Sequence, residues 1–186
     1  ARRLGAQVWA YDVRPETSEQ VESLGAKFID LDLGEEGSGE GGYAKELSDE
    51  AKQKQQQLLS EELQKADVLI STAAIPCRPA PRLITEETVK GMREGSVIID
   101  MAAATGGNCE LTEAGSVIVK HGVQIVGHTN YPAMVPADAS SFFSRNLVNL
   151  MELLVTREDE KLVRPDYMED EVTEAALVVY QGKVRF

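Results

Sequence analysis

Asp12 is the residue whose type and place in the sequence point most directly to chemistry. It closes an apolar stretch, residues 7–11, that is typical of a buried strand. An acid at such a strand end can hydrogen-bond both ribose hydroxyls in the adenosine half of a dinucleotide, and its charge repels a 2′-phosphate, which favours NAD over NADP. Asp12 could equally cap the helix expected over residues 14–24. Val13 and Arg14 follow as further candidate contacts, and Arg14 could in principle meet a phosphate.

A second candidate region joins a strand to a loop of small residues. Residues 67–72 form a compact apolar run that predicts a strand buried on both faces, and three prolines follow by residue 81. Ligands of open α/β sheets bind in the crevice outside the carboxyl ends of the strands, and small side chains there let a flat ring approach the backbone. The candidate contacts are Thr72, Ala73, Ala74 and Ile75. The alternative is a core strand followed by an ordinary loop.

Two further loops carry small or polar residues after apolar strands. Residues 96–101 predict a strand that opens into a loop containing Ala103, and residues 123–126 predict a last strand before the Pro-containing loop 127–139. The candidates in that last loop are Gly127, Thr129, Asn130, Tyr131 and Pro132. Four such strand ends at one sheet edge indicate a ligand site more specifically than any one of them.

No catalytic or metal-binding set accompanies these candidates. The sequence shows no Ser-His-Asp arrangement, no activated cysteine and no paired carboxylates at strand ends, and Asp100, within its strand, is expected to have a structural role. His128 could act as a base, with loop packing as the alternative. Hydride transfer to a second nicotinamide needs no base, because no proton moves with the hydride. The two cysteines and two histidines lack metal-ligand spacing, and we expect reduced thiols.

Strand and helix patterns alternate along most of the chain. The junction Leu-Gly-Ala occurs at residues 4–6 and again at residues 24–26, as expected where a helix stops and the next strand starts. Strands are expected over residues 7–12, 27–31, 67–72, 96–101 and 123–126, with 117–119 as a hairpin partner of the last, and helices over residues 14–24, 44–65 and 85–95. These elements predict an α/β fold with a doubly wound, mostly parallel Rossmann-type sheet.

The two ends of the sequence bear on domain organisation. The chain opens on what looks like the last turn of a helix, and no glycine fingerprint precedes Asp12, so we expect the first βα unit to lie upstream. Residues 1–155 are expected to form the nucleotide-binding domain, and residues 156–186 an acidic segment that ends in a strand pair. The helix after residue 139 predicts core packing through one apolar face, which comprises Phe143, Leu147, Leu150, Met151 and Leu154.

Charge and hydropathy exclude some classes of partner. The net charge of −12 argues against nucleic acid and anionic membrane surfaces as direct partners. No apolar run approaches the roughly 18 residues needed to span a bilayer, so no direct membrane insertion is expected. The Gly- and Glu-rich stretch 33–43 has no phosphate-loop spacing and is expected to be a surface loop.

Several motifs together resemble one known family. They are residues 11–15 (Tyr-Asp-Val-Arg-Pro), 41–46 (Gly-Gly-Tyr-Ala-Lys-Glu), 71–76 (Ser-Thr-Ala-Ala-Ile-Pro), 95–100 (Gly-Ser-Val-Ile-Ile-Asp) and 106–110 (Gly-Gly-Asn-Cys-Glu). Over about residues 1–155 the chain resembles the NAD(H)-binding domain, domain I of the alpha subunit, of proton-translocating nicotinamide nucleotide transhydrogenase. The resemblance implies a sheet without its first βα unit and without that domain's N-terminal lobe.

The resemblance also implies a function and a set of partners. Domain I of the family binds NAD(H) and exchanges hydride with NADP(H) held on a separate domain, while a membrane domain couples the exchange to proton translocation. A homodimer is implied, with peripheral attachment at the cytoplasmic side of the bacterial inner membrane or, alternatively, at the matrix side of the mitochondrial inner membrane. Residues 127–136 match a mobile lid. Met134 and Cys77 depart from the pattern, which usually has a basic residue and a glycine there.

Alanine dehydrogenase, which is related in fold, supplies the alternative function of an NAD-dependent amino-acid dehydrogenase. That family has a catalytic Asp at the position that matches Ala104, and it differs in the inserted segment 41–45. Both differences favour the transhydrogenase. A non-catalytic interaction module is the third hypothesis.

Overall fold

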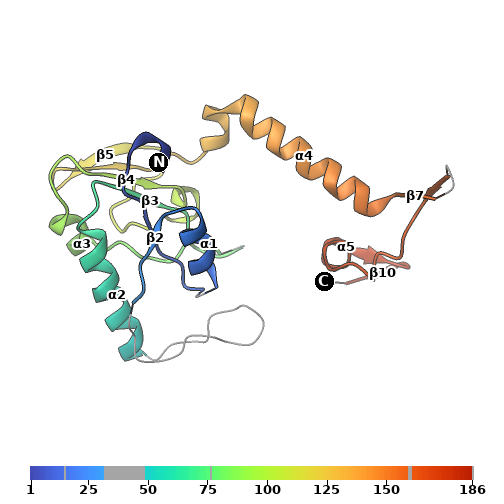
Figure 1. The fold of residues 1–186 in the computed structure, drawn as a ribbon, viewed down its shortest axis with the longest axis horizontal. Coiled ribbons are helices and arrows are strands. Elements are labelled where there is room, and N and C mark those ends of the chain that lie inside the picture. The colour runs from blue at the N-terminus through green and yellow to red at the C-terminus, as the bar shows by residue number, and fades with distance from the viewer. Residues whose placement is uncertain (15, 32–48, 76, 159–160, 186) are drawn as a thin grey trace. The chain divides into compact units, whose positions relative to one another are not determined.

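The computed structural model describes residues 1–14, 16–31, 49–75, 77–158 and 161–185 of the chain. They belong to two compact units, Ala1–Thr129 and Asn130–Phe186 (Figure 1). The stretch 33–43 and the start of the helix expected from residue 44 lie outside the described residues. The domain boundary expected after residue 155 stays a prediction.

A four-stranded sheet is the centre of the first unit. Its strand order is β3 (Val68–Ser71), β4 (Val97–Asp100), β6 (Val123–Val126) and β5 (Val117–Lys120). The strands β3, β4 and β6 run parallel, in a register that pairs Ser71 with Asp100 and Ile99 with Val126, and β5 is antiparallel to β6. This arrangement confirms the mostly parallel α/β fold that the sequence predicts.

The predicted hairpin between β5 and β6 is also confirmed. It turns at His121 and Gly122, both of which have positive φ, 52° and 77°. Two consecutive left-handed residues are what a tight two-residue hairpin turn requires, because they match the right-handed twist of the flanking strands.

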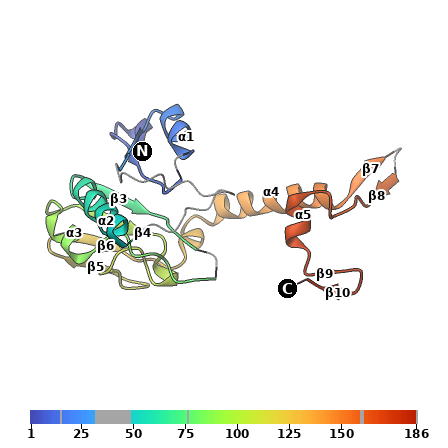
Figure 2. The ribbon, with the colours of Figure 1, turned by 90° about the horizontal axis from the view of Figure 1, so that it is seen from below.

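One face of the four-stranded sheet carries the hydrophobic core. Side chains alternate along β3, so that Leu69 is buried while Val68 and Ile70 are exposed. The helices α2 (Asp49–Leu63) and α3 (Glu86–Gly91) add Leu63 and Val89 to this core, and Figure 2 views the sheet from the side of α2. The buried cluster comprises Leu69, Ile84, Val89, Met92, Ile98, Cys109, Val123 and Ile125.

Helix α3 begins as the sequence predicts and ends earlier. The Thr85 hydroxyl accepts a hydrogen bond from the Thr88 amide, so Thr85 is the N-cap. The helix ends at Gly91 and not near Gly95, because Met92 already has an extended backbone with ψ at 156°. Met92 still packs into the core, with 5% of its surface exposed.

The first residues of the chain form a smaller parallel sheet. It pairs β1 (Trp9–Ala10) with β2 (Lys27–Phe28) across helix α1 (Thr17–Ser23), after a 3₁₀ turn η1 (Arg2–Leu4). The Lys27 ammonium lies 4.6 Å from the centroid of the Trp9 ring, a cation–π contact across the pair. Both strands are shorter than predicted. Among the described residues no strand pairs with the second edge of β1 or the free edge of β3, so the two sheets stay separate.

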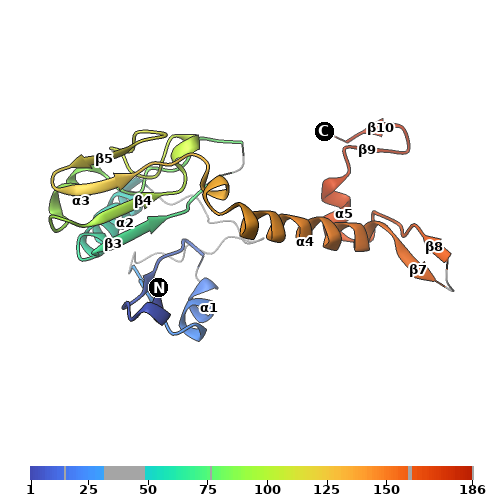
Figure 3. The same ribbon diagram turned by 90° about the horizontal axis from the view of Figure 1, so that it is seen from above.

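The second unit begins with a 3₁₀ turn and a long helix. Its elements are η3 (Tyr131–Met134), α4 (Pro136–Leu154), β7 (Thr156–Glu158), β8 (Lys161–Val163), α5 (Glu171–Ala176), β9 (Val179–Tyr180) and β10 (Lys183–Val184), shown in Figure 3. The terminal strand pair is confirmed as β9–β10, and the β7–β8 hairpin lies in a segment for which the sequence predicts no strand. No helix among the described residues is long and apolar enough to cross a bilayer.

The core packing predicted for α4 is wrong for this chain. Phe143, Leu147 and Met151 have 65%, 48% and 57% of their surfaces exposed, and α4 has no buried residue. An amphipathic pattern predicts that a helix has an apolar face but does not specify what covers it. Within its own unit, α4 is followed only by short hairpins and α5, which leave this face open.

Candidate functional site

Three loops leave the same edge of the four-stranded sheet. Because β3, β4 and β6 are parallel, their carboxyl ends at Ser71, Asp100 and Val126 lie side by side in register. The backbone amide of Met101 donates to the Ser71 carbonyl at 2.9 Å, which joins the first two loops where they start. The convergence that the sequence predicts is therefore found for three of the four strand ends.

Asp12, the fourth strand-end residue, follows β1 and belongs to the smaller sheet. The Arg14 backbone amide and Nε donate to Asp12 Oδ1 at 2.9 and 3.0 Å, and Arg14 Nη2 donates to Oδ2 at 3.0 Å. These hydrogen bonds, of which the side-chain ones are the largest cause, hold the pKa of Asp12 below its usual range. The carboxylate is partly exposed, and Val13 beside it is 54% exposed. Asp12 is thus an accessible, ionised acceptor at a strand end.

One side-chain contact ties this strand end to helix α2. The amide of Gln55 donates to the hydroxyl of Tyr11, the residue before Asp12, at 2.6 Å. Burial of the Tyr11 ring is the main reason that its pKa lies above the ordinary value. Tyr11 therefore remains a neutral hydroxyl that fixes the chain next to Asp12.

The loop after β3 presents its small residues to solvent. Thr72, Ala74 and Ile75 are exposed, whereas Ala73 is partly buried. The Ala73 carbonyl accepts a hydrogen bond from the Asn108 side chain at 2.8 Å, and the Ala80 amide donates to the Thr105 carbonyl at 2.9 Å. The loop is thus fastened at two points to the loop after β4.

The loop after β4 is organised by Asp100, which is fully buried. Its Oδ1 accepts from the Ala102 amide at 3.0 Å, and its Oδ2 accepts from the Cys109 amide at 3.0 Å and the Thr112 hydroxyl at 2.6 Å. A Cβ at Gly107, where φ is +80°, would lie 2.7 Å from Oδ2, so only glycine fits. The structural role predicted for Asp100 is confirmed.

The candidate residues of this loop differ in exposure. Ala103 is buried, with 2% of its surface exposed, while its neighbour Ala104 is exposed. A ligand at this edge would therefore meet Ala104 more readily than the Ala103 side chain. Ala103 stays a candidate only through its backbone.

Asn108 is a further residue for which the sequence predicts no role, although it lies within a quoted motif. It is fully buried and hydrogen-bonds to both neighbouring segments. An amide side chain directly after Gly106 and Gly107 is the signal that marks it, because two glycines with positive φ bring the backbone close to Asp100.

The loop after β6 is divided between the two units. Gly127 is buried in the first unit, and a Cβ there would lie 2.5 Å from the Glu113 carbonyl oxygen, so the backbone passes too closely for a side chain. Thr129 ends that unit and is exposed. In the second unit the Asn130 side chain accepts from the Ala133 amide at 3.3 Å and caps η3, which contains Tyr131 and Pro132.

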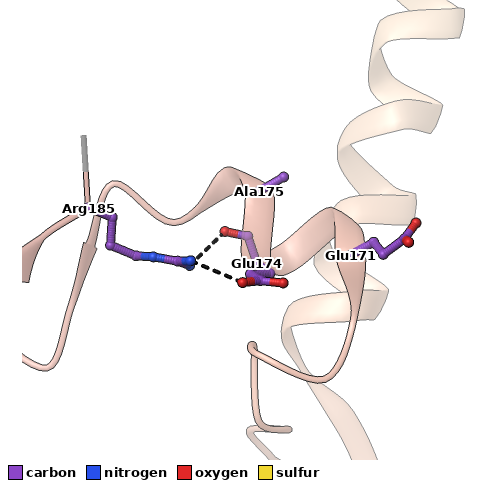
Figure 4. Close-up of a pocket in the computed structure, with 4 residues that line it drawn as sticks. All are labelled: Glu171, Glu174, Ala175 and Arg185. Carbon is purple, nitrogen blue, oxygen red and sulfur yellow. Dashed lines mark hydrogen bonds and ion pairs between the residues drawn. The ribbon is translucent and has the colours of Figure 1, made fainter. Parts of the chain in front are cut away.

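The described residues hold no cluster of three or more metal-binding side chains. Cys109 is buried, and burial raises the pKa of its thiol, whereas Cys77 is exposed. A cavity of about 210 Å³ lies in the second unit, between Glu171, Glu174, Ala175 and Arg185 (Figure 4). It is smaller than the roughly 300–1,000 Å³ of small-molecule sites. Its Arg185–Glu174 ion pair, at 3.1 Å, is a contact within the unit.

Comparison with known proteins decides the family. Residues 1–186 match the family model described as alanine dehydrogenase/PNT, C-terminal domain. The chain belongs to this family. An NAD(P) transhydrogenase alpha subunit of Rhodospirillum rubrum is 50% identical over 186 residues, which are 99% of this chain and 48% of that protein. The chain therefore spans about half the length of this curated relative.

Solved structures of the family agree with the fold. The crystal structure of transhydrogenase from Sinorhizobium meliloti matches with a TM-score of 0.64 and 44% identity, over 81% of this chain and 38% of that chain. An L-alanine dehydrogenase matches with a TM-score of 0.64 over 99% of this chain and 45% of that chain, and its 24% identity shows a shared fold alone. The resemblance to these two groups of proteins is confirmed.

Proposed function

We propose that the chain is the NAD(H)-binding part of an NAD(P) transhydrogenase. The observation that carries this proposal is the set of parallel strand ends at Ser71, Asp100 and Val126, from which small-residue loops leave at one edge. Dinucleotides bind at such an edge in open α/β sheets. The 50% identity to a transhydrogenase alpha subunit supports the choice of activity.

The residues present fit a dinucleotide. In the proposal, Asp12 accepts hydrogen bonds from the adenosine ribose, assisted by the adjacent backbone of Val13 and Arg14. The exposed, small-residue segment from Thr72 to Ile75 offers backbone groups with little side-chain obstruction. The nicotinamide side is proposed to lie along this segment, with Ala103 and with Gly127, Thr129, Asn130, Tyr131 and Pro132 from the last loop.

The reaction we propose is hydride exchange between NAD(H) on this chain and NADP(H) on a partner domain. The nicotinamide ring supplies the hydride chemistry, and the chain's own residues bind and orient it. Because the hydride passes between two nicotinamides, no proton has to be taken up by a side chain, in keeping with a candidate site without a catalytic acid–base pair. A membrane domain would couple the exchange to proton translocation.

The wider arrangement belongs to the same proposal. We place the chain as a peripheral part of a homodimeric enzyme at the cytoplasmic side of a bacterial inner membrane, with the mitochondrial matrix side as the alternative. Residues 127–136 are proposed to act as a lid. Alanine dehydrogenase activity is disfavoured, because Ala104 is exposed and offers only a methyl group where the resemblance implies a catalytic acid.

A fluorescence titration of the complete gene product with NADH, beside NADPH, tests the proposal. We expect saturable NADH binding with NADPH at least about tenfold weaker, because the Asp12 carboxylate repels a 2′-phosphate. Reduction of an NADP analogue should then depend on an added NADP(H)-binding partner. Oxidation of NADH by pyruvate and ammonia would favour alanine dehydrogenase, and the absence of any nucleotide binding would favour an interaction module.

A further inference from the structure

Asn108 occupies a junction between three segments of the candidate site. Its Oδ1 accepts a hydrogen bond from the Ser71 hydroxyl at 2.7 Å, at the last residue of β3. Its Nδ2 donates to the carbonyl oxygens of Ala73 and Pro81, both at 2.8 Å. One side chain therefore holds the start and the end of the loop that runs from β3 through the prolines.

The backbone of Asn108 continues the same junction. Its carbonyl oxygen accepts from the amides of Leu83 and Ile84 at 2.9 and 3.0 Å, just beyond the prolines. The Cys109 amide, next along the chain, donates to the buried Asp100 carboxylate at 3.0 Å. Asn108 is thus fixed from the β4 side and in turn fixes the β3 side.

Only an asparagine side chain matches this surrounding. Two carbonyl oxygens face Nδ2 and one hydroxyl faces Oδ1, which fixes the orientation of the amide and uses both ends of it. An aspartate would turn a carboxylate oxygen towards two carbonyl oxygens, and an apolar residue would leave the buried polar groups without partners. No buried side-chain nitrogen or oxygen among the described residues lacks a partner here.

We propose that Asn108 is a positioning residue for the nicotinamide half of the dinucleotide, acting through the backbone of residues 72–75. This inference rests on the proposed function. Small residues leave the loop few side-chain contacts of its own, and Thr72, Ala74 and Ile75 are exposed. The Asn108 and Ser71 side chains then fix where the loop's peptide groups point, while Asp12 holds the adenosine half independently.

The test compares NADH with AMP, which offers only the adenosine half, in the complete gene product. We expect Asn108→Ala to weaken NADH binding by about tenfold, and Ser71→Ala by about threefold, with AMP affinity unchanged within about twofold. Ser96→Ala is the matched control: Ser96 is 3% exposed and its hydroxyl donates to the Ala66 carbonyl at 3.4 Å, before β4 and away from the loops. It should leave both affinities unchanged.

Each result has a distinct meaning. Weaker NADH binding with intact AMP binding supports the inference, and Ser71→Ala provides this test even if Asn108→Ala does not fold. Unchanged NADH affinity in both variants would overturn it. Parallel losses for NADH and AMP would also overturn it, because they show a general loss of folded protein. If the unaltered protein binds neither ligand, the proposed function fails and the inference fails with it.

Discussion

Arg14 holds Asp12 through both carboxylate oxygens, with the guanidinium and the backbone amide of one residue engaging its neighbour two positions back. Sequence reasoning treats these side chains as rivals, one for a ribose and one for a phosphate, whereas the structure joins them. Ribose hydroxyls arriving at Asp12 therefore meet an ionised acceptor whose charge is partly offset. The pair can still accept the two hydroxyls, because a carboxylate offers more acceptor positions than Arg14 occupies.

Replacing Asp12 with Ala should weaken NADH binding by about 1–3 kcal/mol, since charge-assisted hydrogen bonds to the ribose are lost. Fluorescence titration of both proteins measures the difference. Asp30→Ala is the control, because Asp30 is an exposed acid beyond the end of β2 that carries the same charge. Unchanged NADH affinity in Asp12→Ala would reject the ribose assignment.

Replacing Arg14 with Gln should increase the preference for NADH over NADPH. Without the guanidinium the Asp12 charge acts on a 2′-phosphate in full, and an exposed ion pair of this kind is worth up to about 1 kcal/mol, or about fivefold. Arg93→Gln serves as the control, because Arg93 forms a similarly exposed pair with Asp67 at 2.7 Å, at the opposite end of β3. A fall in the NADH preference would show that Arg14 places Asp12 for the ribose and does not attract a 2′-phosphate.

The dependence of NADH binding on pH should follow the Asp12–Arg14 pair. Arg14 lowers the pKa of Asp12 in the folded protein, so the pair stabilises the fold above the ordinary carboxyl pKa and this stabilisation is lost as pH falls through the lowered value. In Arg14→Gln the carboxyl protonates at higher pH. NADH affinity should then decline at higher pH than in the unaltered protein, in titrations from about pH 6 to 3 with folding followed by circular dichroism.

Replacing Asp100 with Asn should destabilise the fold by about 2–4 kcal/mol in urea unfolding. An amide nitrogen would face donors, either the Ala102 amide or the Cys109 amide and Thr112 hydroxyl, in a fully buried place. Asp67→Asn is the control, with its side chain 74% exposed, and should cost less than about 1 kcal/mol. Equal effects of the two changes would show that Asp100 does not organise the loop.

The two cysteines should differ sharply in reactivity. Cys77 is exposed, whereas Cys109 is buried and its pKa is raised, so little thiolate forms there at neutral pH. Brief treatment with iodoacetamide and peptide mapping should find Cys77 modified and Cys109 intact until urea is added. Early modification of Cys109 would indicate that its loop opens readily.

Much of the fold follows from local sequence patterns. The strand runs around Leu69, Ile98 and Ile125, the Thr85 cap and the turn at His121 and Gly122 are each specified by a few neighbouring residues, and the structure confirms them. The core predicted for α4 depends on which surface meets the helix, and a pattern of apolar residues does not contain that information.

The candidate site was predictable to a similar degree. Strand ends with small residues mark the edge, because the parallel direction of the strands follows from the repeated βα units. The contacts of Asn108 with Ser71 and Pro81 join residues 37 and 27 positions apart, and no local spacing announces them. The engagement of Asp12 by Arg14 is local, yet the types of the two side chains allow either a mutual pair or two separate ligand contacts.

The separation of the two sheets gives the two halves of the candidate site unequal resistance to opening. The β1–β2 pair that precedes Asp12 has a two-residue register, while β4 is flanked on both sides by strands and lies over the core. Amide hydrogens of Lys27 and Ile29 should therefore exchange with deuterium well before those of Ile98 and Ile99. The adenosine half would then be held by the less protected part of the protein, and bound nucleotide should slow exchange most strongly there.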